Sequence, residues 1–96
     1  MPLTRDIVIR NALGLHARPA MQFVDLANQF RSNIVVHKNA IGEDEAVTVD
    51  GKSVMQMITL EATQGTPLRI EADGDDAQHA IEQLARLVED KFGEED

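Results

Sequence analysis

The spacing of apolar residues constrains this chain most, because it switches repeatedly between the period of a strand and the period of a helix. Alternation of apolar and polar residues predicts a first strand at 6–10, where Ile7 and Ile9 share one face. Helical spacing follows, with apolar side chains along one stripe. The stripe comprises Ala20, Phe23, Val24, Ala27 and Phe30. This pattern predicts a helix that begins at or just after His16.

The same two patterns continue through the rest of the chain. Strands are predicted at 32–38, 46–51 and 66–74, and a short helix at 53–62. A last helix is predicted to start at Asp75, where Gln78 three residues later completes an N-terminal capping box. Its apolar stripe comprises Ala77, Ala80, Ile81, Leu84, Leu87 and Val88. The resulting order is strand, helix, strand, strand, helix, strand, helix.

This order predicts an α+β fold of two layers, in which a four-stranded antiparallel sheet carries three helices on one face. The other face of the sheet is expected to be solvated. Between the second and third strands, residues 39–46 form a long polar hairpin connection with Gly42 at its turn, whose role stays open. Because no repeat or linker interrupts the pattern, residues 1–96 are expected to form a single domain.

Composition and charge exclude several classes of protein. The formal net charge of −8 argues against nucleic-acid binding, and the absence of cysteine excludes disulfides and thiolate chemistry. The N-terminus carries charged residues, and no apolar run approaches the length of a membrane span. We therefore expect a cytoplasmic protein that does not bind a membrane. The acidic runs GEDEA (42–46) and EDKFGEED (89–96) are expected to be solvated.

The segment LGLHARPA places a histidine at the predicted start of the first helix. Pro19 is tolerated there because the first turn lacks intrahelical acceptors for its N–H groups. The backbone amides of Ala17, Arg18 and Ala20 are therefore expected to be unsatisfied, at the positive end of the helix dipole. Such an end binds anions, so the sequence predicts a phosphate-binding position beside His16.

The chemistry expected at this position is nucleophilic. A neutral imidazole has a free lone pair and attacks phosphorus, while the Arg18 guanidinium binds phosphate oxygens. Gly14 permits the turn that directs the ring. His37 and His79 lack this setting and are expected at the surface, so no metal site is predicted. The alternative is that His16 is a loop or N-cap residue with no chemistry.

At these motifs the chain resembles the HPr family, the histidine-containing phosphocarriers of the bacterial phosphotransferase system. GLHARPA resembles that family's active-site motif, GKSVMQM its regulatory serine segment, and TQGTPLRIEADGDDAQHAIEQL its last strand and helix. The resemblance implies an open-faced β-sandwich with sheet order 1-4-2-3. It also implies that His16 accepts a phosphoryl group at Nδ1 from enzyme I and passes it to a histidine of an EIIA domain. Such a carrier is a monomer without a cofactor and is not a stand-alone enzyme.

Ser53 opens the motif SVMQ, which is an S-x-x-Q capping box with Gln56. Ser53 is therefore expected to cap the second helix. The resemblance adds a second role, phosphorylation by an HPr kinase/phosphorylase, which places negative charge on the surface that meets partners.

A partner-binding surface is expected beside the histidine, because apolar side chains flank it and methionine adapts to several partners. Its expected members are Leu15, Met21, Val54, Met55 and Ile58. Three functions stay open at this point: a phosphoryl carrier acting through His16, a regulatory interaction protein acting through Ser53, and a structural α+β domain without phosphate chemistry. For a carrier, the sugar-transport and nitrogen-type regulatory branches both remain open.

Overall fold

The computed structural model describes residues 2–39 and 45–94, and its strands form one antiparallel sheet in the order β1-β4-β2-β3. The elements are β1 (Leu3–Val8), α1 (Ala17–Ala27), β2 (Asn33–Lys38), β3 (Val47–Asp50), α2 (Val54–Ile58), β4 (Pro67–Asp73), α3 (Ala77–Glu89) and a 3₁₀ turn, η1 (Lys91–Gly93). This confirms the predicted sheet order. No helix among these residues has both the length and the apolar character needed to cross a bilayer.

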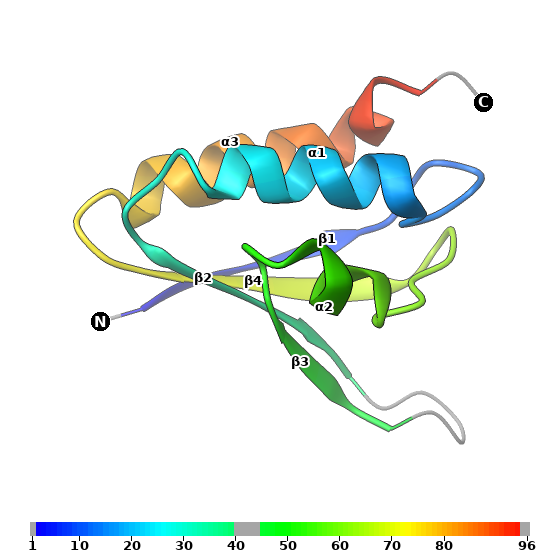
Figure 1. Ribbon diagram of the computed structural model, residues 1–96, viewed down its shortest axis with the longest axis horizontal. Coiled ribbons are helices and arrows are strands. Elements are labelled where there is room, and N and C mark those ends of the chain that lie inside the picture. Colours follow the sequence, from blue (N-terminus) through cyan, green and yellow to red (C-terminus); the bar gives the residue numbers. More distant parts are fainter. Residues whose placement is uncertain (1, 40–44, 95–96) are drawn as a thin grey trace.

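The helices α1 and α3 lie side by side over one face of the sheet, as Figure 1 shows. The core between the two layers is aliphatic, with Phe23 as the largest of its fully buried side chains. Burying a side chain of this size contributes about 1.5–3 kcal/mol to folding. The short helix α2 packs against α1 and β3 and adds the fully buried Met57 to the core.

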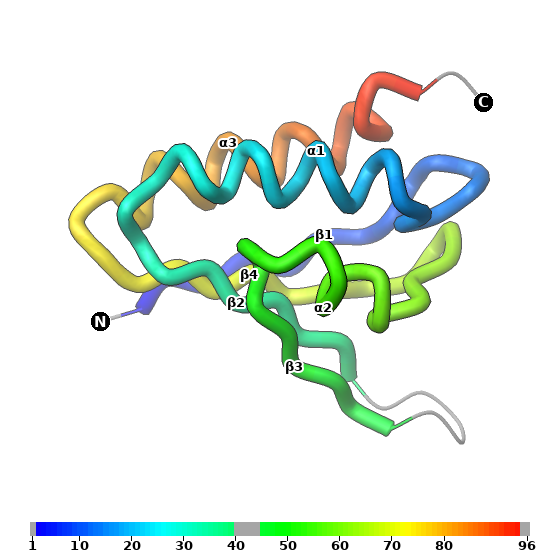
Figure 2. The backbone as a smooth tube through the Cα atoms, in the orientation of Figure 1, coloured from blue at the N-terminus to red at the C-terminus, as the bar shows by residue number. Residues whose placement is uncertain are grey.

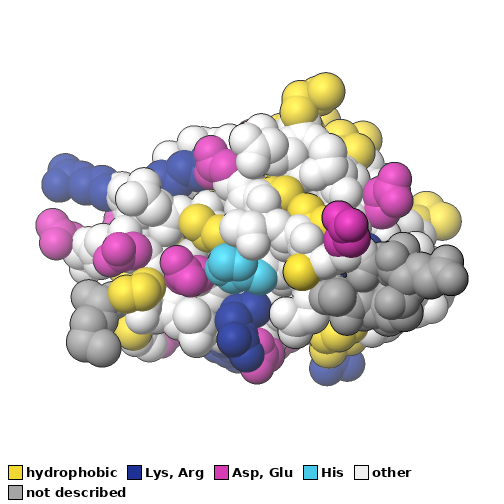
Figure 3. All heavy atoms as spheres, turned by 90° about the horizontal axis from the view of Figure 1, so that it is seen from below, with side chains coloured by type: hydrophobic (Ala, Val, Ile, Leu, Met, Phe, Trp, Pro, Cys, Tyr) yellow, Lys and Arg dark blue, Asp and Glu magenta, His cyan; other side chains and the backbone are white. Residues whose placement is uncertain are grey.

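The alternation in β4 shows why these residues form a half-buried strand. Leu68, Ile70 and Ala72 are buried beneath the helices. Arg69 points to the opposite face and pairs there with Asp6 of β1, through an Nε–Oδ1 distance of 2.8 Å. This opposite face is not covered, and Figure 3 shows it with a histidine among acidic and basic side chains.

The hairpin between β2 and β3 retains its predicted position, because Lys38 pairs with Val47 at the last described register of the ladder. The predicted turn at Gly42 lies outside the described residues.

Two helices are shorter than their apolar patterns predict. The helix α1 ends at Ala27, so Phe30 lies beyond it while still packing against the core.

The helix α2 covers five residues instead of the predicted 53–62. The Thr59 hydroxyl donates to the Gln56 carbonyl, a side-chain bond that competes with helix continuation. Glu61 then adopts a φ of 49°, which no continuing right-handed helix contains.

The capping box predicted for the last helix is wrong. Residue Asp76, not Asp75, is the N-cap of α3, and the Gln78 amide donates to Glu82 instead of reaching back.

The Asp76 carboxylate accepts from Ser32 Oγ at 2.6 Å, Ser32 N at 3.0 Å and Arg31 N at 2.9 Å. These donors hold the pKa of Asp76 at about 2, below its ordinary 3.8. They come from the α1–β2 connection, so Asp76 joins two segments and does not cap its own helix.

The loop before α1 is bent by Gly14, whose φ is +71°. A bond of 2.8 Å from the Leu15 amide to the Ala62 carbonyl ties this loop to the segment that precedes β4. A Cβ at Gly14 would lie 2.5 Å from that same carbonyl oxygen, so no other residue fits without moving backbone. Gly14 therefore determines how the chain approaches His16.

The Asp76 network predicts an acid-dependent loss of stability. Because the folded pKa is about 2 and the ordinary value is 3.8, the unfolded chain binds more protons between these pH values. The free energy of unfolding should therefore fall as the pH drops through this window, and denaturant titrations at several pH values measure it. In Asp76→Asn this contribution should disappear, and in Ser32→Ala it should shrink, because the Ser32 hydroxyl is the main cause of the low pKa. An equally steep slope in Asp76→Asn would contradict the assignment.

Replacing Gly14 tests the loop geometry, with Gly65 as the matched control. Gly65 also has a positive φ, +89°, but a Cβ there meets no atom within 4 Å. Gly65→Ala should cost about 1–2 kcal/mol of unfolding free energy from backbone strain alone. Gly14→Ala should cost about 1–3 kcal/mol more, because it also forces the Ala62 backbone to move. Equal losses in urea denaturation would show that the close approach is unimportant.

Candidate functional site

His16 is the N-cap residue of α1, with an extended backbone at φ −79° and ψ −174°. Its carbonyl accepts the first helical hydrogen bond, from the Ala20 amide at 3.0 Å. The expectation that the Ala20 amide is unsatisfied is therefore wrong, because the helix begins one residue after His16 and Ala20 closes its first turn. The helix does begin where the sequence predicts.

The amides of Ala17 and Arg18 open the helix and have no acceptor among residues 2–39 and 45–94. Both residues are exposed. Two amides without a described acceptor and the positive end of an 11-residue helix thus lie next to His16, and Arg18 on the same turn supplies a guanidinium whose charge acts on Glu94. Together they are suited to hold a phosphate-like anion.

The two ring nitrogens of His16 have different surroundings. Nε2 lies 2.7 Å from Glu94 Oε2, and the side chains of His16 and Glu94 are 36% and 13% exposed. Within the part of the chain that the structure describes, Nδ1 has no hydrogen-bond partner. The nitrogen that the family resemblance names as the phosphoryl acceptor is therefore the one that has no partner among the described residues.

Asn11 connects this histidine to the loop that carries it. Its side chain is fully buried, and its Nδ2 donates to Glu94 Oε1 at 2.9 Å and to the Gly14 carbonyl at 2.6 Å. Figure 2 shows how this is possible, because the turn after α3 and the loop before α1 lie at the same end of the molecule. The C-terminal segment is thus part of the site.

Glu94 is a site residue that the sequence reasoning missed. The acidic tail was expected to be solvated, which is wrong for this residue. The hydrogen bond from Asn11 is the main cause that lowers the pKa of Glu94; burial opposes it, and His16 and the charge of Arg18 lower it further. The chain returns to the site because Lys91 and Phe92 adopt left-handed φ values of 58° and 56° and Phe92 is buried. The sequence did contain one indication of this contact. Phe92 is the single aromatic residue of the acidic run 89–96, and an aromatic side chain there indicates that the run packs against the protein.

The apolar residues expected around His16 divide into two groups. Leu15 was expected at the surface, which is wrong: it is 5% exposed and belongs to the core, since its amide binds the Ala62 carbonyl and draws it inward. Val54 is half-buried and packs against the core. Four large apolar side chains on the loop before α1, on α1 and on α2 are exposed, and we call them the apolar surface residues. They are Leu13, Met21, Met55 and Ile58.

Ser53 is the N-cap of α2, and its hydroxyl accepts from the Gln56 amide at 3.2 Å. Only this half of the predicted capping box forms. The Gln56 side chain accepts from the Asp50 amide at 2.9 Å, while the Ser53 amide donates to the Asp50 carbonyl. Ser53 therefore has a structural role that is independent of any modification.

The other two histidines lie away from α1's first turn. His37 is half-buried on the open sheet face, where Nδ1 lies 3.0 Å from Thr48 Oγ1 and Nε2 lies 3.3 Å from Glu71 Oε1. The His79 ring is exposed and packs edge-on against Phe30, with ring centroids 5.4 Å apart, beyond the C-terminal end of α1. Neither shares the amides and guanidinium that adjoin His16.

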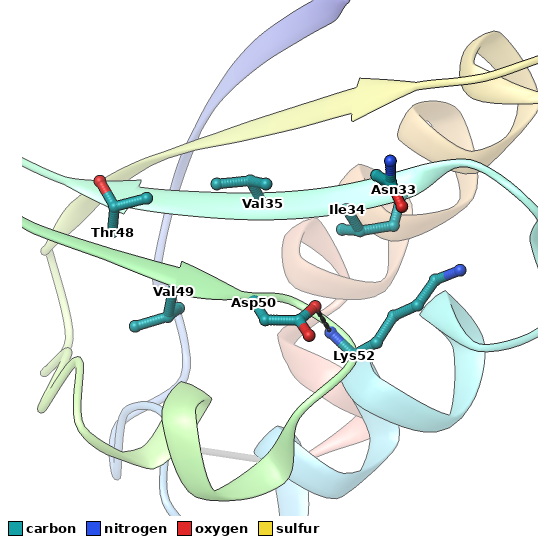
Figure 4. A pocket seen from close by; sticks show the side chains of 7 residues that line it. All are labelled: Asn33, Ile34, Val35, Thr48, Val49, Asp50 and Lys52. Carbon is teal, nitrogen blue, oxygen red and sulfur yellow. Dashed lines mark hydrogen bonds between the residues drawn. The ribbon is translucent and has the colours of Figure 1, made fainter.

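A shallow hollow lies over β2 and β3, as Figure 4 shows. Asp50 Oδ1 accepts there from the Lys52 amide at 2.9 Å. The lining consists of Asn33, Ile34, Val35, Thr48, Val49, Asp50 and Lys52. Lys52 belongs to the motif GKSVMQM, but none of the lining residues lies in the segment around His16, so the hollow is separate from the histidine site.

Comparison with known proteins agrees with this geometry. The family model described as the PTS HPr component phosphorylation site matches residues 3–90. Phosphocarrier protein NPr of Proteus mirabilis is 38% identical over 91 residues, which cover 95% of this chain and 96% of that protein. Phosphocarrier protein HPr of Neisseria meningitidis is 40% identical over 92 residues, covering 96% and 97%.

Solved structures show the same fold. HPr-C-His from Thermoanaerobacter tengcongensis superposes with a TM-score of 0.83 at 41% identity, and covers 97% of this chain and 98% of that one. An HPr from Bacillus anthracis gives 0.81 at 33% identity, covering 91% and 96%. The resemblance seen in the motifs is confirmed, and the chain belongs to the HPr family, the phosphocarrier proteins of the phosphotransferase system.

Proposed function

We propose that this protein carries a phosphoryl group on His16, which it accepts from a phosphohistidine of enzyme I and passes to a histidine of an EIIA domain. The observation that supports this is the arrangement at the start of α1. The side chain of His16 is half-buried, its Nδ1 has no partner within the described residues, and the neighbouring amides of Ala17 and Arg18 have no acceptor there either. The members of the HPr family are phosphocarriers, and phosphoryl transfer is a reaction for which such a site is suited.

The transfer step needs no metal ligand or general base from this chain. The lone pair of His16 Nδ1 attacks phosphorus, a new N–P bond forms, and the N–P bond of the donor histidine breaks. The donor nitrogen keeps the electron pair of that bond. The second transfer repeats the step with His16 as the leaving group, so the carrier returns to its starting state.

The surroundings of His16 stabilise the added charge. The phosphoryl group carries negative oxygens, to which the amides of Ala17 and Arg18 and the Arg18 guanidinium donate hydrogen bonds. Hydrogen bonds that involve a charged group contribute about 1.5–3 kcal/mol each. Arg18 binds such oxygens through its planar fork of donors, so it anchors the group while the ring nitrogen holds it.

Docking of both partners uses the apolar surface residues. Met21 and Met55 supply flexible side chains that adapt to different partners. Exposed apolar groups beside polar ones are typical of contact surfaces, and α1 and α2, which carry three of the four, pack against each other. A small surface of this kind fits the short-lived complexes that a monomeric cytoplasmic carrier must form and leave.

Phosphorylation by enzyme I and phosphoenolpyruvate tests the carrier function. The protein should acquire one acid-labile phosphate, which mass spectrometry measures before and after acid treatment. His16→Ala should abolish it, because no other described histidine adjoins the amides at the start of α1. His37→Ala and His79→Ala are the matched controls and should retain it, and Ser53→Ala should retain it as well. Acid-labile phosphate on His16→Ala would overturn the assignment.

A second function, regulation through Ser53, is favoured by the position of this residue. Ser53 caps the helix that carries the exposed Met55 and Ile58. A phosphate there adds about −1.5 to −2 charges beside the apolar surface residues, while a helix N-terminus tolerates the charge. Such a modification by an HPr kinase/phosphorylase would weaken docking of an acidic partner without unfolding the protein.

Two isosteric variants separate charge from capping at this position. Asp and Asn are both good N-cap residues, so Ser53→Asp and Ser53→Asn should leave the unfolding free energy within about 0.5 kcal/mol of wild type. Only Ser53→Asp adds a negative charge. It should therefore slow phosphoryl transfer from enzyme I severalfold in a stopped-flow assay, while Ser53→Asn should not. Equal rates for the two variants would exclude regulation by charge.

A further inference from the structure

We propose that Glu94 is a positioning residue that holds the neutral ring of His16 in one tautomer, with the proton on Nε2 and the lone pair on Nδ1. This inference rests on the proposed function, because it explains why Nδ1 is the nitrogen that reacts. The acidic residue third from the end of the sequence thus acquires a defined task.

The distance between the two groups carries the argument. Glu94 Oε2 lies 2.7 Å from His16 Nε2, which is the length of a charge-assisted hydrogen bond. An ionised carboxylate only accepts hydrogen bonds, so the proton of this bond must reside on Nε2. A neutral imidazole has one proton, and Nδ1 is consequently the nitrogen with the free lone pair.

Asn11 keeps the carboxylate in place through its second oxygen. Both neighbours of Asn11 Nδ2, the Gly14 carbonyl and Glu94 Oε1, are acceptors, so the amide nitrogen must face them. This orientation leaves Asn11 Oδ1 buried with no hydrogen-bond partner in the described part of the chain. A fully buried amide that leaves its own oxygen unsatisfied is costly, and it shows how strongly the two acceptors determine the arrangement.

A carboxylate can accept hydrogen bonds from Asn11 and from His16 at the same time. Asn11 Nδ2 and His16 Nε2 each require an acceptor, and the two oxygens of Glu94 provide one each. Glutamine at this position would offer one acceptor oxygen and one donor amino group. It could keep both bonds only by donating to Nε2, which would place the ring proton on Nδ1. The burial of Phe92 holds the segment near the loop, which lowers the entropy cost of keeping Glu94 in place.

The same contact assists the reacting state. When Nδ1 forms its bond to phosphorus, the ring retains the Nε2 proton and becomes positively charged. The Glu94 carboxylate already lies against that proton and stabilises the charge. When the phosphoryl group leaves, Nδ1 recovers its electron pair and the ring is neutral again with its proton still on Nε2. No proton has to enter or leave the site during either transfer.

Nitrogen-15 NMR of the histidine rings tests the tautomer directly on the unphosphorylated protein, at a pH where the rings are neutral. In the wild type, His16 should be almost entirely in the Nε2-protonated form. Glu94→Ala should raise the population of the Nδ1-protonated form. Glu94→Gln should raise it as well, because an amide whose oxygen accepts from Asn11 presents its amino group to Nε2. Glu89→Ala is the matched control, because Glu89 pairs with Arg5 on the surface of α3, and it should leave the His16 signals unchanged.

The rate of phosphoryl uptake from enzyme I gives a second readout. It should fall about tenfold in Glu94→Ala, the size of effect expected when the group that orients a functional histidine is removed. A wild-type ring with its proton on Nδ1, or an unchanged tautomer population in Glu94→Ala, would overturn the proposal. If the tautomer responds as expected but His16 never acquires phosphate, the positioning role stands and the carrier function fails.

Discussion

The hydrogen bond between the Leu15 amide and the Ala62 carbonyl is the contact on which the functional end of this molecule depends. It joins the loop before α1 to the segment before β4, two parts of the chain separated by two strands and two helices. The bond forms because Gly14 supplies a positive φ and because Leu15 enters the core. As a result, α1 begins at a fixed place and His16 occupies its N-cap.

The resulting site divides two tasks between the two sides of one imidazole ring. One side belongs to the folded protein, through Glu94 and the buried Asn11. The other side has no partner among the described residues and, in the proposed function, meets the phosphoryl group together with the backbone amides of Ala17 and Arg18. The first side is therefore held by hydrogen bonds and the second side is open, an arrangement that suits the nucleophile of the proposed transfer because it orients the ring without enclosing it.

Apolar periodicity predicted the order of strands and helices along the chain and the start of α1, because both follow from which faces must be buried. The sheet order was implied only by the resemblance to the HPr family. Apolar periodicity also predicted a continuous helix to 62, which side-chain competition at Thr59 and the left-handed backbone of Glu61 prevent. The position of Ser32 opposite Asp76 was not predictable, since it depends on where the α1–β2 connection passes.

The motif around His16 predicted the local arrangement, a histidine at the start of α1 next to the amides of Ala17 and Arg18. Glu94 lies 78 positions away in the chain, and local pattern contains no information about such a contact. Leu15 was misplaced for a related reason. A leucine beside a functional residue looks like surface in sequence, and only the bond of its backbone to Ala62 reveals that it points inward.

The path of the chain after α3 has a practical meaning for anyone who joins this protein to another. The last turn passes beside the histidine, whereas the opening strand starts at the far end of the molecule, as Figure 1 shows. A tether attached after Glu94 therefore emerges among the groups that partner proteins must reach in the proposed function, and it pulls on a carboxylate in direct contact with the ring. A tether attached before Leu3 emerges away from them, so fusions and immobilised forms should be built from that side.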